Sequence, residues 1–233
     1  MRRLARIAGA LMLAGGVLTL AWVLVVWQWQ DPFTAAYTRW QQHQLAQSLD
    51  RQLADYQPFH VKTAGLAAER RQISREGARY RQDAKPGQAI GRIVIDRLGL
   101  NMVLVNGTDH DDLTKGPGRD LRTFMPGQDR LVYVAGHRTT YLAPFSHIDA
   151  IRPGDRIRLE LPYATFTYRA TRHRVVAATD LSVLRSPRHE LLELQACHPR
   201  FFATQRYIVY ARLASVSPRG GTPYAVAAVA AGR

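Results

Sequence analysis

The sequence predicts an all-β globular domain that follows an N-terminal apolar helix and a polar helical segment. Three observations support this prediction: an uncharged apolar run near the N-terminus, a change to short β-like runs after Pro86-Gly87, and glycine and proline turns between those runs. With 233 residues and 46% hydrophobic content, the chain is long enough to bury a sizeable core, and disorder throughout is excluded.

The charge of the chain is strongly positive but spread along its length. Lys+Arg number 32 against 18 Asp+Glu, for a net charge of +14. No zinc-finger spacing, basic heptad or aromatic RNA-binding signature accompanies this charge, so we expect attraction to anionic envelope polymers or lipid headgroups and no nucleic-acid partner. The one cysteine excludes an intramolecular disulfide and any multi-thiolate metal site, and we expect no cofactor.

Residues 1–30 are predicted to be a signal-anchor helix. Ile7 to Trp27 is a nearly continuous apolar run, which at about 1.5 Å per helical residue matches a bilayer core of roughly 30 Å. The alternative is a cleaved signal peptide, but that apolar region is usually only about 7–15 residues long. Because Arg2, Arg3 and Arg6 should stay cytoplasmic, we expect a single-pass cell-membrane protein whose later residues are extracytoplasmic.

Residues 31–85 are predicted to be an extracytoplasmic helical stalk. Apolar residues recur at three- and four-residue steps from Trp40 to Tyr56, and Pro58 interrupts the pattern. The second stretch, 65–81, is dominated by Arg and Glu, so we expect it to pack weakly and to hold the rest of the chain away from the membrane. A partner-binding coiled coil would need sustained heptads, which are not present.

Residues 86–215 are predicted to form one β domain, and 216–233 a flexible tail. The spacing of strands and turns suits a sandwich or a closed barrel rather than alternating βαβ units. The apolar stretch at 225–230 is too short to span a bilayer. The predicted strands are 90–95, 101–105, 131–135, 156–161, 165–171, 174–178, 191–196 and 206–213.

Cys197 comes directly after the strand-like run 191–196 and before His198-Pro199, where a strand should give way to a loop. A lone Cys is more often a small buried hydrophobic residue, and the thiol alone favours that interpretation. A free thiol in an exported protein can, however, oxidise with nothing gained unless it reacts. Its position therefore makes Cys197 a candidate nucleophile.

His137 follows the strand-like run that ends at Ala135, and Gly136 leaves room there for the close approach of another segment. His198 adjoins the cysteine, but neighbours on an extended chain point away from each other. Asp109-His110-Asp111-Asp112 resembles a metal cluster but lacks Gly and Glu at the spacing of a cation loop, so we expect no metal. The other histidines lie in polar segments where solvated roles are the default: His43, His60, His147, His173 and His189.

Arg206 begins the last long strand-like run, nine residues after Cys197. With a loop between them, the two strand ends can lie side by side, and a guanidinium there can donate to a substrate carbonyl or an oxyanion. A solvated surface charge is the default for any single arginine in so basic a chain. Its position relative to Cys197 is what distinguishes Arg206.

These residues resemble the ordered His, Cys and Arg motifs of sortases, the membrane-anchored cysteine transpeptidases of mostly Gram-positive bacteria. The resemblance covers about Gly87 to Leu213. Cys-His-Pro and His-Arg-Thr-Thr-Tyr look most like the class E sortases of high-GC actinobacteria. The motifs are Ala135-Gly136-His137-Arg138-Thr139-Thr140, Ala143-Pro144-Phe145, Leu194-x-x-Cys197 and Arg206-Tyr207-Ile208-Val209.

Two features depart from the family pattern. Ala196 stands where sortases usually have a threonine before the cysteine, which puts substrate detail in doubt more than the chemistry. Asp31-Pro32-Phe33 is similar to the lid motif of pilus-building class C sortases, but it lies at the predicted membrane exit and we interpret it as interfacial.

The resemblance implies a closed eight-stranded β-barrel with short helices and catalysis by His137, Cys197 and Arg206. The implied reaction cleaves a Leu-(Pro/Ala)-x-Thr-Gly-like sorting signal of secreted proteins between Thr and Gly. The Thr carbonyl, held as a thioacyl group on Cys197, would then pass to an amine of a peptidoglycan precursor. The implied partners are those secreted proteins, the amine acceptor and the lipid bilayer.

Other readings of the same residues stay open. An envelope cysteine protease would use the same Cys and His but release its product to water, and a pilus-type sortase would use a Lys amine as acceptor. A non-catalytic envelope scaffold would not need Cys197 at all.

Overall fold

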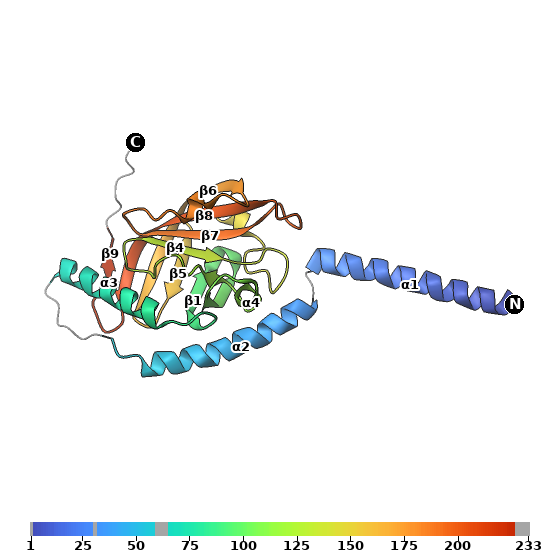
Figure 1. Cartoon of the computed structure of the whole chain (residues 1–233), viewed down its shortest axis with the longest axis horizontal. Coiled ribbons are helices and arrows are strands. Elements are labelled where there is room, and N and C mark those ends of the chain that lie inside the picture. Colours follow the sequence, from blue (N-terminus) through green and yellow to red (C-terminus); the bar gives the residue numbers. More distant parts are fainter. Residues whose placement is uncertain (1, 30–31, 59–64, 227–233) are drawn as a thin grey trace.

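The computed structural model describes residues 2–29, 32–58 and 65–226 (Figure 1). Helix α1 (Arg2–Trp29) projects away from the rest of the chain. Its segment Arg2–Val25 is long and apolar enough to cross a membrane, and none of its apolar window is buried against the protein. The helix predicted from the uncharged run is therefore confirmed.

The β domain is a closed barrel of eight strands. Hydrogen-bonded neighbours follow the order β6-β5-β1-β2-β3-β4-β7-β8, and the pairing of β6 with β8 closes the circle, while β9 adds to the edge of β8. The predicted barrel is confirmed. The strands are β1 (Ala89–Ile95), β2 (Leu100–Asn106), β3 (Gly118–Arg119), β4 (Leu131–Ala135), β5 (Arg156–Glu160), β6 (Ala164–Ala177), β7 (Leu191–His198), β8 (Gln205–Pro218) and β9 (Tyr224–Ala225).

Two strand predictions differ from the structure in extent. The runs 165–171 and 174–178 belong to one long strand, β6, whose pairing with β8 shifts register between Ala170 and Arg172. This irregularity breaks the alternation of polar and apolar residues, which is why the sequence pattern divides there. The tail is also more ordered than expected up to Val226, because β9 pairs with Ser215 and Val216; residues 227–233 lie outside the described chain.

The short helices lie in the connections between strands. A 3₁₀ turn, η1, and helix α4 lie on either side of β2, η2 follows the loop after β4, and η3 lies between β6 and β7. Their bounds are η1 (Asp96–Leu98), α4 (His110–Leu113), η2 (Ile148–Ala150) and η3 (Leu181–Leu184). The barrel interior is filled by the inward-facing residues of the strands, such as Ile93, Phe166 and Leu194, each 0% exposed.

Helices α2 (Pro32–Asp55) and α3 (Leu66–Asp83) pack against the barrel, which corrects the expectation of a weakly packed spacer. In α2, Leu49 is 1% exposed and packs with Ala89 of β1 and Val103 of β2. Gln42 of α2 also bonds the backbone of β2: its Oε1 accepts from the Val103 N–H at 2.7 Å. The division of the chain at residue 86 stays a prediction.

Helix α3 packs closely although it carries few apolar residues. Ile73 is 4% exposed and belongs to the main core. Gly77 permits the contact, because a Cβ there would lie 2.9 Å from the Pro126 carbonyl oxygen. Tyr80 donates to the Ile90 carbonyl at 3.1 Å. Polar contacts add to these, since the buried Glu76 accepts from the Tyr56 hydroxyl and the Arg81 guanidinium lies 4.5 Å from the Phe124 ring centroid. A count of apolar residues misses this arrangement.

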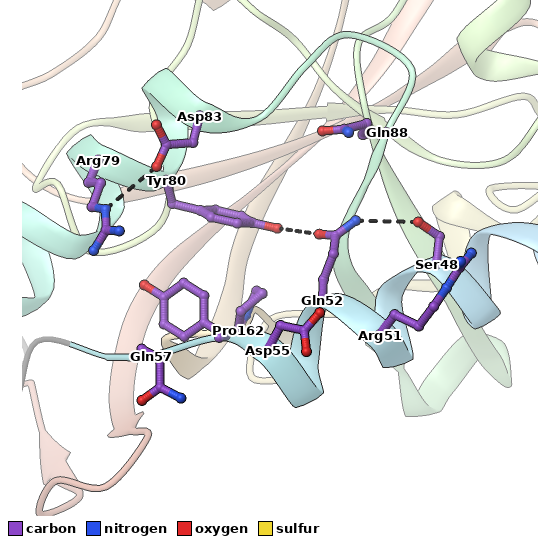
Figure 2. Close-up of a pocket in the computed structure, with 11 residues that line it drawn as sticks. Ser48, Arg51, Gln52, Asp55, Gln57, Arg79, Tyr80, Asp83, Gln88 and Pro162 are labelled. Atoms are coloured by element: carbon purple, nitrogen blue, oxygen red, sulfur yellow. Dashed lines mark hydrogen bonds and ion pairs between the residues drawn. The ribbon is translucent and has the colours of Figure 1, made fainter.

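A polar cleft of about 710 Å³ separates α2 from α3 beside the barrel (Figure 2). Tyr80 of α3 reaches across it to the Gln52 side chain of α2, with Oη and Oε1 3.4 Å apart, and Gln52 in turn faces Ser48. The two helices are thus linked to each other as well as to the barrel.

We predict that Ile73→Ala lowers the free energy of unfolding by about 2–5 kcal/mol, because it leaves a cavity in the core. Leu66→Ala in the same helix is the matched control; Leu66 is 51% exposed, so the change should stay within about 0.5 kcal/mol. Denaturant unfolding monitored by near-ultraviolet circular dichroism measures both. Equal stability of the two variants would show that α3 is only a spacer.

Candidate active site

The three candidate residues meet at one end of three adjacent strands. Strand β7 pairs with β4 in parallel and with β8 in antiparallel orientation. In the first pairing Ala135 is opposite Gln195, and the Gly136 N–H donates to the Gln195 carbonyl at 3.0 Å, so the loop that carries His137 leaves β4 beside the end of β7. In the second pairing Cys197 is directly opposite Arg206. The structure therefore pairs Cys197 with Arg206 and places His137 just after the strand on the other side of β7.

Cys197 belongs to the outer face of the barrel. Along β7 the alternate residues Leu192, Leu194 and Ala196 are each 0% exposed and belong to the interior core. Because side chains alternate along a strand, Cys197 projects outward. Its thiol is free and half-buried, so the buried, unreactive interpretation does not describe it. A strand end with a partly accessible thiol is a suitable position for a nucleophile.

His137 follows β4 in a closely packed loop. A Cβ on Gly136 would lie 2.7 Å from the Phe145 ring, so glycine provides the close approach expected there. The His137 ring is half-buried, and its centroid lies 5.0 Å from that of Tyr141. Burial, and to a lesser extent the charge of His110, hold the pKa of His137 below its usual value. Its Nε2 is buried without a hydrogen-bond partner among the described residues.

Arg206 is half-buried at the start of β8. Its Nη1 donates to the Ala203 carbonyl at 2.7 Å and to the Gln205 carbonyl at 2.9 Å. These two bonds hold the guanidinium at the strand end, opposite Cys197. A planar group with five donors has further N–H groups to offer a substrate oxygen from this position.

Arg138 is a site residue that the sequence did not single out. Its side chain is 3% exposed and forms an ion pair with Asp149 of η2 at 2.9 Å. Its Nη1 donates to the Cys197 carbonyl at 3.3 Å and lies 2.9 Å from Nδ1 of His198. Arg138 therefore ties the loop after His137 to the Cys197 backbone and to the His198 side chain. Its place next to His137 was the only signal in the sequence, and that signal does not distinguish Arg138 from the many other arginines of the chain.

Two segments distant in sequence complete the surroundings of His137. Tyr141 lies between His137 and His110 of α4, whose ring centroid is 6.3 Å from that of Tyr141. The Tyr141 N–H also donates to Thr34 Oγ1 at 3.3 Å, which places the first turn of α2 beside the site. Among the described residues, no group of three or more His, Cys, Asp or Glu side chains could hold a metal ion.

Comparisons with known proteins match this chain to one family. The Sortase domain matches residues 93–214, which is more than half of the chain. Sortase D of Bacillus subtilis is 33% identical over 165 residues, covering 65% of this chain and 81% of the relative. Sortase SrtE1 of Streptomyces coelicolor is 28% identical over 167 residues, covering 64% of this chain and 47% of that protein.

Solved structures agree. Sortase E of Streptomyces avermitilis is 32% identical with a TM-score of 0.52, covering 60% of this chain and 97% of that one. A Clostridium perfringens Sortase D5 transpeptidase has a TM-score of 0.60 at 23% identity, covering 74% and 98% of the two chains, which supports the fold. Proteins named sortase D and sortase E thus both resemble this chain. Its barrel, its sequence and its relatives agree that the chain belongs to the sortase family of cysteine transpeptidases.

Proposed function

We propose that this sortase cleaves a Leu-(Pro/Ala)-x-Thr-Gly-like sorting signal and joins its Thr to an amine of a cell-wall precursor, with Cys197, His137 and Arg206 at the reacting atoms. The observation that supports the proposal is the pairing of β7, which has Arg206 directly opposite Cys197 on one side and the strand that leads to His137 on the other. Because a cysteine transpeptidase needs a thiol and the chain has one cysteine, Cys197 is the nucleophile.

The reaction proceeds in two balanced halves. The Cys197 thiolate attacks the Thr carbonyl, Arg206 donates to the developing oxyanion, and the Thr–Gly bond breaks as imidazolium His137 protonates the departing Gly amine. The acceptor amine then attacks the thioacyl carbon. Neutral His137 takes its proton, the C–S bond breaks, and the thiolate is restored.

The lowered pKa of His137 limits the fraction of molecules that hold the protonated ring needed for the first step. Burial favours the neutral ring, so at neutral pH the resting site holds mostly neutral imidazole. The thiolate and imidazolium pair required for the first step is then present in a fraction of molecules. Only that fraction of molecules reacts with bound substrate, so the apparent rate is lower. The order of the steps is unchanged.

The start of α2 indicates how far the site can lie from the membrane. If α1 spans the membrane, its last residue, Trp29, is only five residue steps along the chain from Thr34 beside the site. At about 3.5 Å per residue this is at most about 18 Å of chain, so the site is held close to the bilayer surface rather than far from it. That position favours an acceptor amine carried at the membrane. The arginines that precede the apolar run favour a cell-membrane location with an extracytoplasmic catalytic domain.

We predict that the full chain ligates a sorting-signal peptide to an added amine and that Cys197→Ala abolishes both the ligated product and hydrolysis. Mass spectrometry of the products, with and without the amine, measures both reactions. Release of the Thr acid alone in the presence of excess amine would favour the protease interpretation, and ligation by Cys197→Ala would refute the proposed chemistry.

Arg206→Lys keeps the positive charge but loses the planar set of donors. We predict a fall in kcat/KM of about 10²–10³-fold, the usual cost of losing an oxyanion donor. Arg75→Lys, at an exposed position of α3, is the matched control and should retain activity within about threefold. Wild-type turnover by Arg206→Lys, at an unchanged melting temperature, would remove Arg206 from the reacting atoms.

His110→Gln tests the electrostatic environment of His137. The variant removes a nearby positive charge, so the pKa of His137 should rise toward its usual value. The acidic limb of the kcat/KM profile should therefore shift to higher pH, by a small amount because His110 is exposed. His43→Gln is the control. A shift of the acidic limb to lower pH would contradict the role of His137. An acidic limb that is unchanged in His137→Ala would also contradict it.

A further inference from the structure

The outer face of the barrel carries a second feature beside the candidate site. A pocket of about 530 Å³ lies over β6, β8 and β7, with η3 and the segment after it on its other side. Arginines line it from three elements: Arg172 and Arg174 of β6, Arg185 after η3, and Arg212 of β8. The one carboxylate in its lining is Glu193 of β7.

The positive charge of this pocket is not cancelled from within. Among the described residues, no carboxylate lies within ion-pair distance of Arg172, Arg174 or Arg185. Glu193 is 3% exposed, and its Oε2 has no hydrogen-bond partner in the described structure. Burial raises its pKa to about 8, so at neutral pH it is mostly protonated. The pocket therefore has a net positive charge and suits an anionic ligand.

Strand register connects this pocket to the nucleophile. On the outer face, Cys197, Arg206 and Val176 form one cross-strand row, and Gln195, Ile208 and Arg174 form the next. The third row is Glu193, Tyr210 and Arg172, whose guanidinium lies 4.1 Å from the Tyr210 ring centroid. Each row is two residues, or about 6.6 Å, further along the strands. Measured along the strands, the row of Arg174 is therefore about 7 Å from the row of Cys197, and the row of Arg172 is about 13 Å from it.

The order of the strands indicates which part of a substrate reaches the pocket. His137, which protonates the departing Gly amine in the proposed reaction, lies on the β4 side of Cys197, and Arg206 lies on the β8 side. The leaving group therefore belongs toward β4, and the acyl part of the peptide toward β8 and β6, where the pocket is. An extended peptide with its Thr at Cys197 places the residue before the Leu about 13 Å away.

We propose that this arginine pocket is a specificity subsite for acidic side chains at the one or two positions before the Leu of the sorting signal. The inference rests on the proposed function, because it takes the direction of the peptide from the roles of His137 and Arg206. Arg172 and Arg174 form the ion pairs, and the neutral Glu193 beside them leaves their charge available. An anionic wall polymer would also be attracted to the pocket. The peptide is favoured because the pocket lies on the same outer face as Cys197, at a distance that an extended sorting signal spans.

The test compares three peptides that differ only in the two residues before the Leu: Glu-Glu, Gln-Gln or Lys-Lys. With the full chain in detergent micelles and a fixed amine, we expect kcat/KM for Glu-Glu to exceed that for Gln-Gln by about three- to tenfold, with Lys-Lys lowest. In the double variant Arg172→Gln/Arg174→Gln, the ratio of Glu-Glu to Gln-Gln should fall to about one.

Arg75→Gln, an exposed arginine of α3, is the charge-matched control and should keep the wild-type ratio. Arg174→Gln alone provides a milder variant, with a reduced ratio expected, if the double variant loses its fold. Equal rates for Glu-Glu and Gln-Gln in the wild type, or an unchanged ratio in the arginine variants, would overturn the subsite. Absence of ligation with all three peptides would overturn the proposed function itself, and the subsite with it.

Discussion

The double pairing of β7 is the constraint on which the site depends. β7 is hydrogen-bonded to β4 on one side and to β8 on the other, so its register fixes Cys197 relative to His137 and Arg206 at once. The core enforces that register, because a slip of one residue would turn Leu192, Leu194 and Ala196 out of the interior and Cys197 into it. The inward-facing apolar residues of β7 thus fix the position of the outward-facing Cys197.

Other segments hold the loops that the strands leave free. The buried Arg138 joins the loop after His137 to η2 through Asp149 and to the Cys197 carbonyl. The Tyr141 N–H binds Thr34, so the first turn of α2 is part of the surroundings of the site. Since α2 also packs on β1 and β2 through Leu49, the segment that leads from the apolar helix is built into the enzyme. Helix α2 therefore links the apolar helix α1 to the surroundings of the site.

Short apolar runs separated by glycine and proline turns were enough to predict most of the barrel, because strands such as β1 and β4 are buried along nearly their whole length. The two-residue strands β3 and β9 carry too little pattern to be seen. Cys197, His137 and Arg206 could be singled out as candidates because they lie at or just beyond strand ends, where motif and turn signals coincide. Arg138 and the arginine pocket were not, since their roles come from cross-strand rows and burial that no local pattern records. The packing of α3 was missed for the related reason that Gly77, rather than an apolar stripe, permits it.

Peptide mapping of the enzyme after brief incubation with a sorting-signal peptide, without an acceptor amine, tests the central claim most directly. The account predicts a mass increase equal to the peptide acyl group, reversed by hydroxylamine and confined to the proteolytic fragment that contains Cys197. An adduct on any other residue, or steady cleavage of the peptide with an unmodified enzyme at every time point, would contradict it.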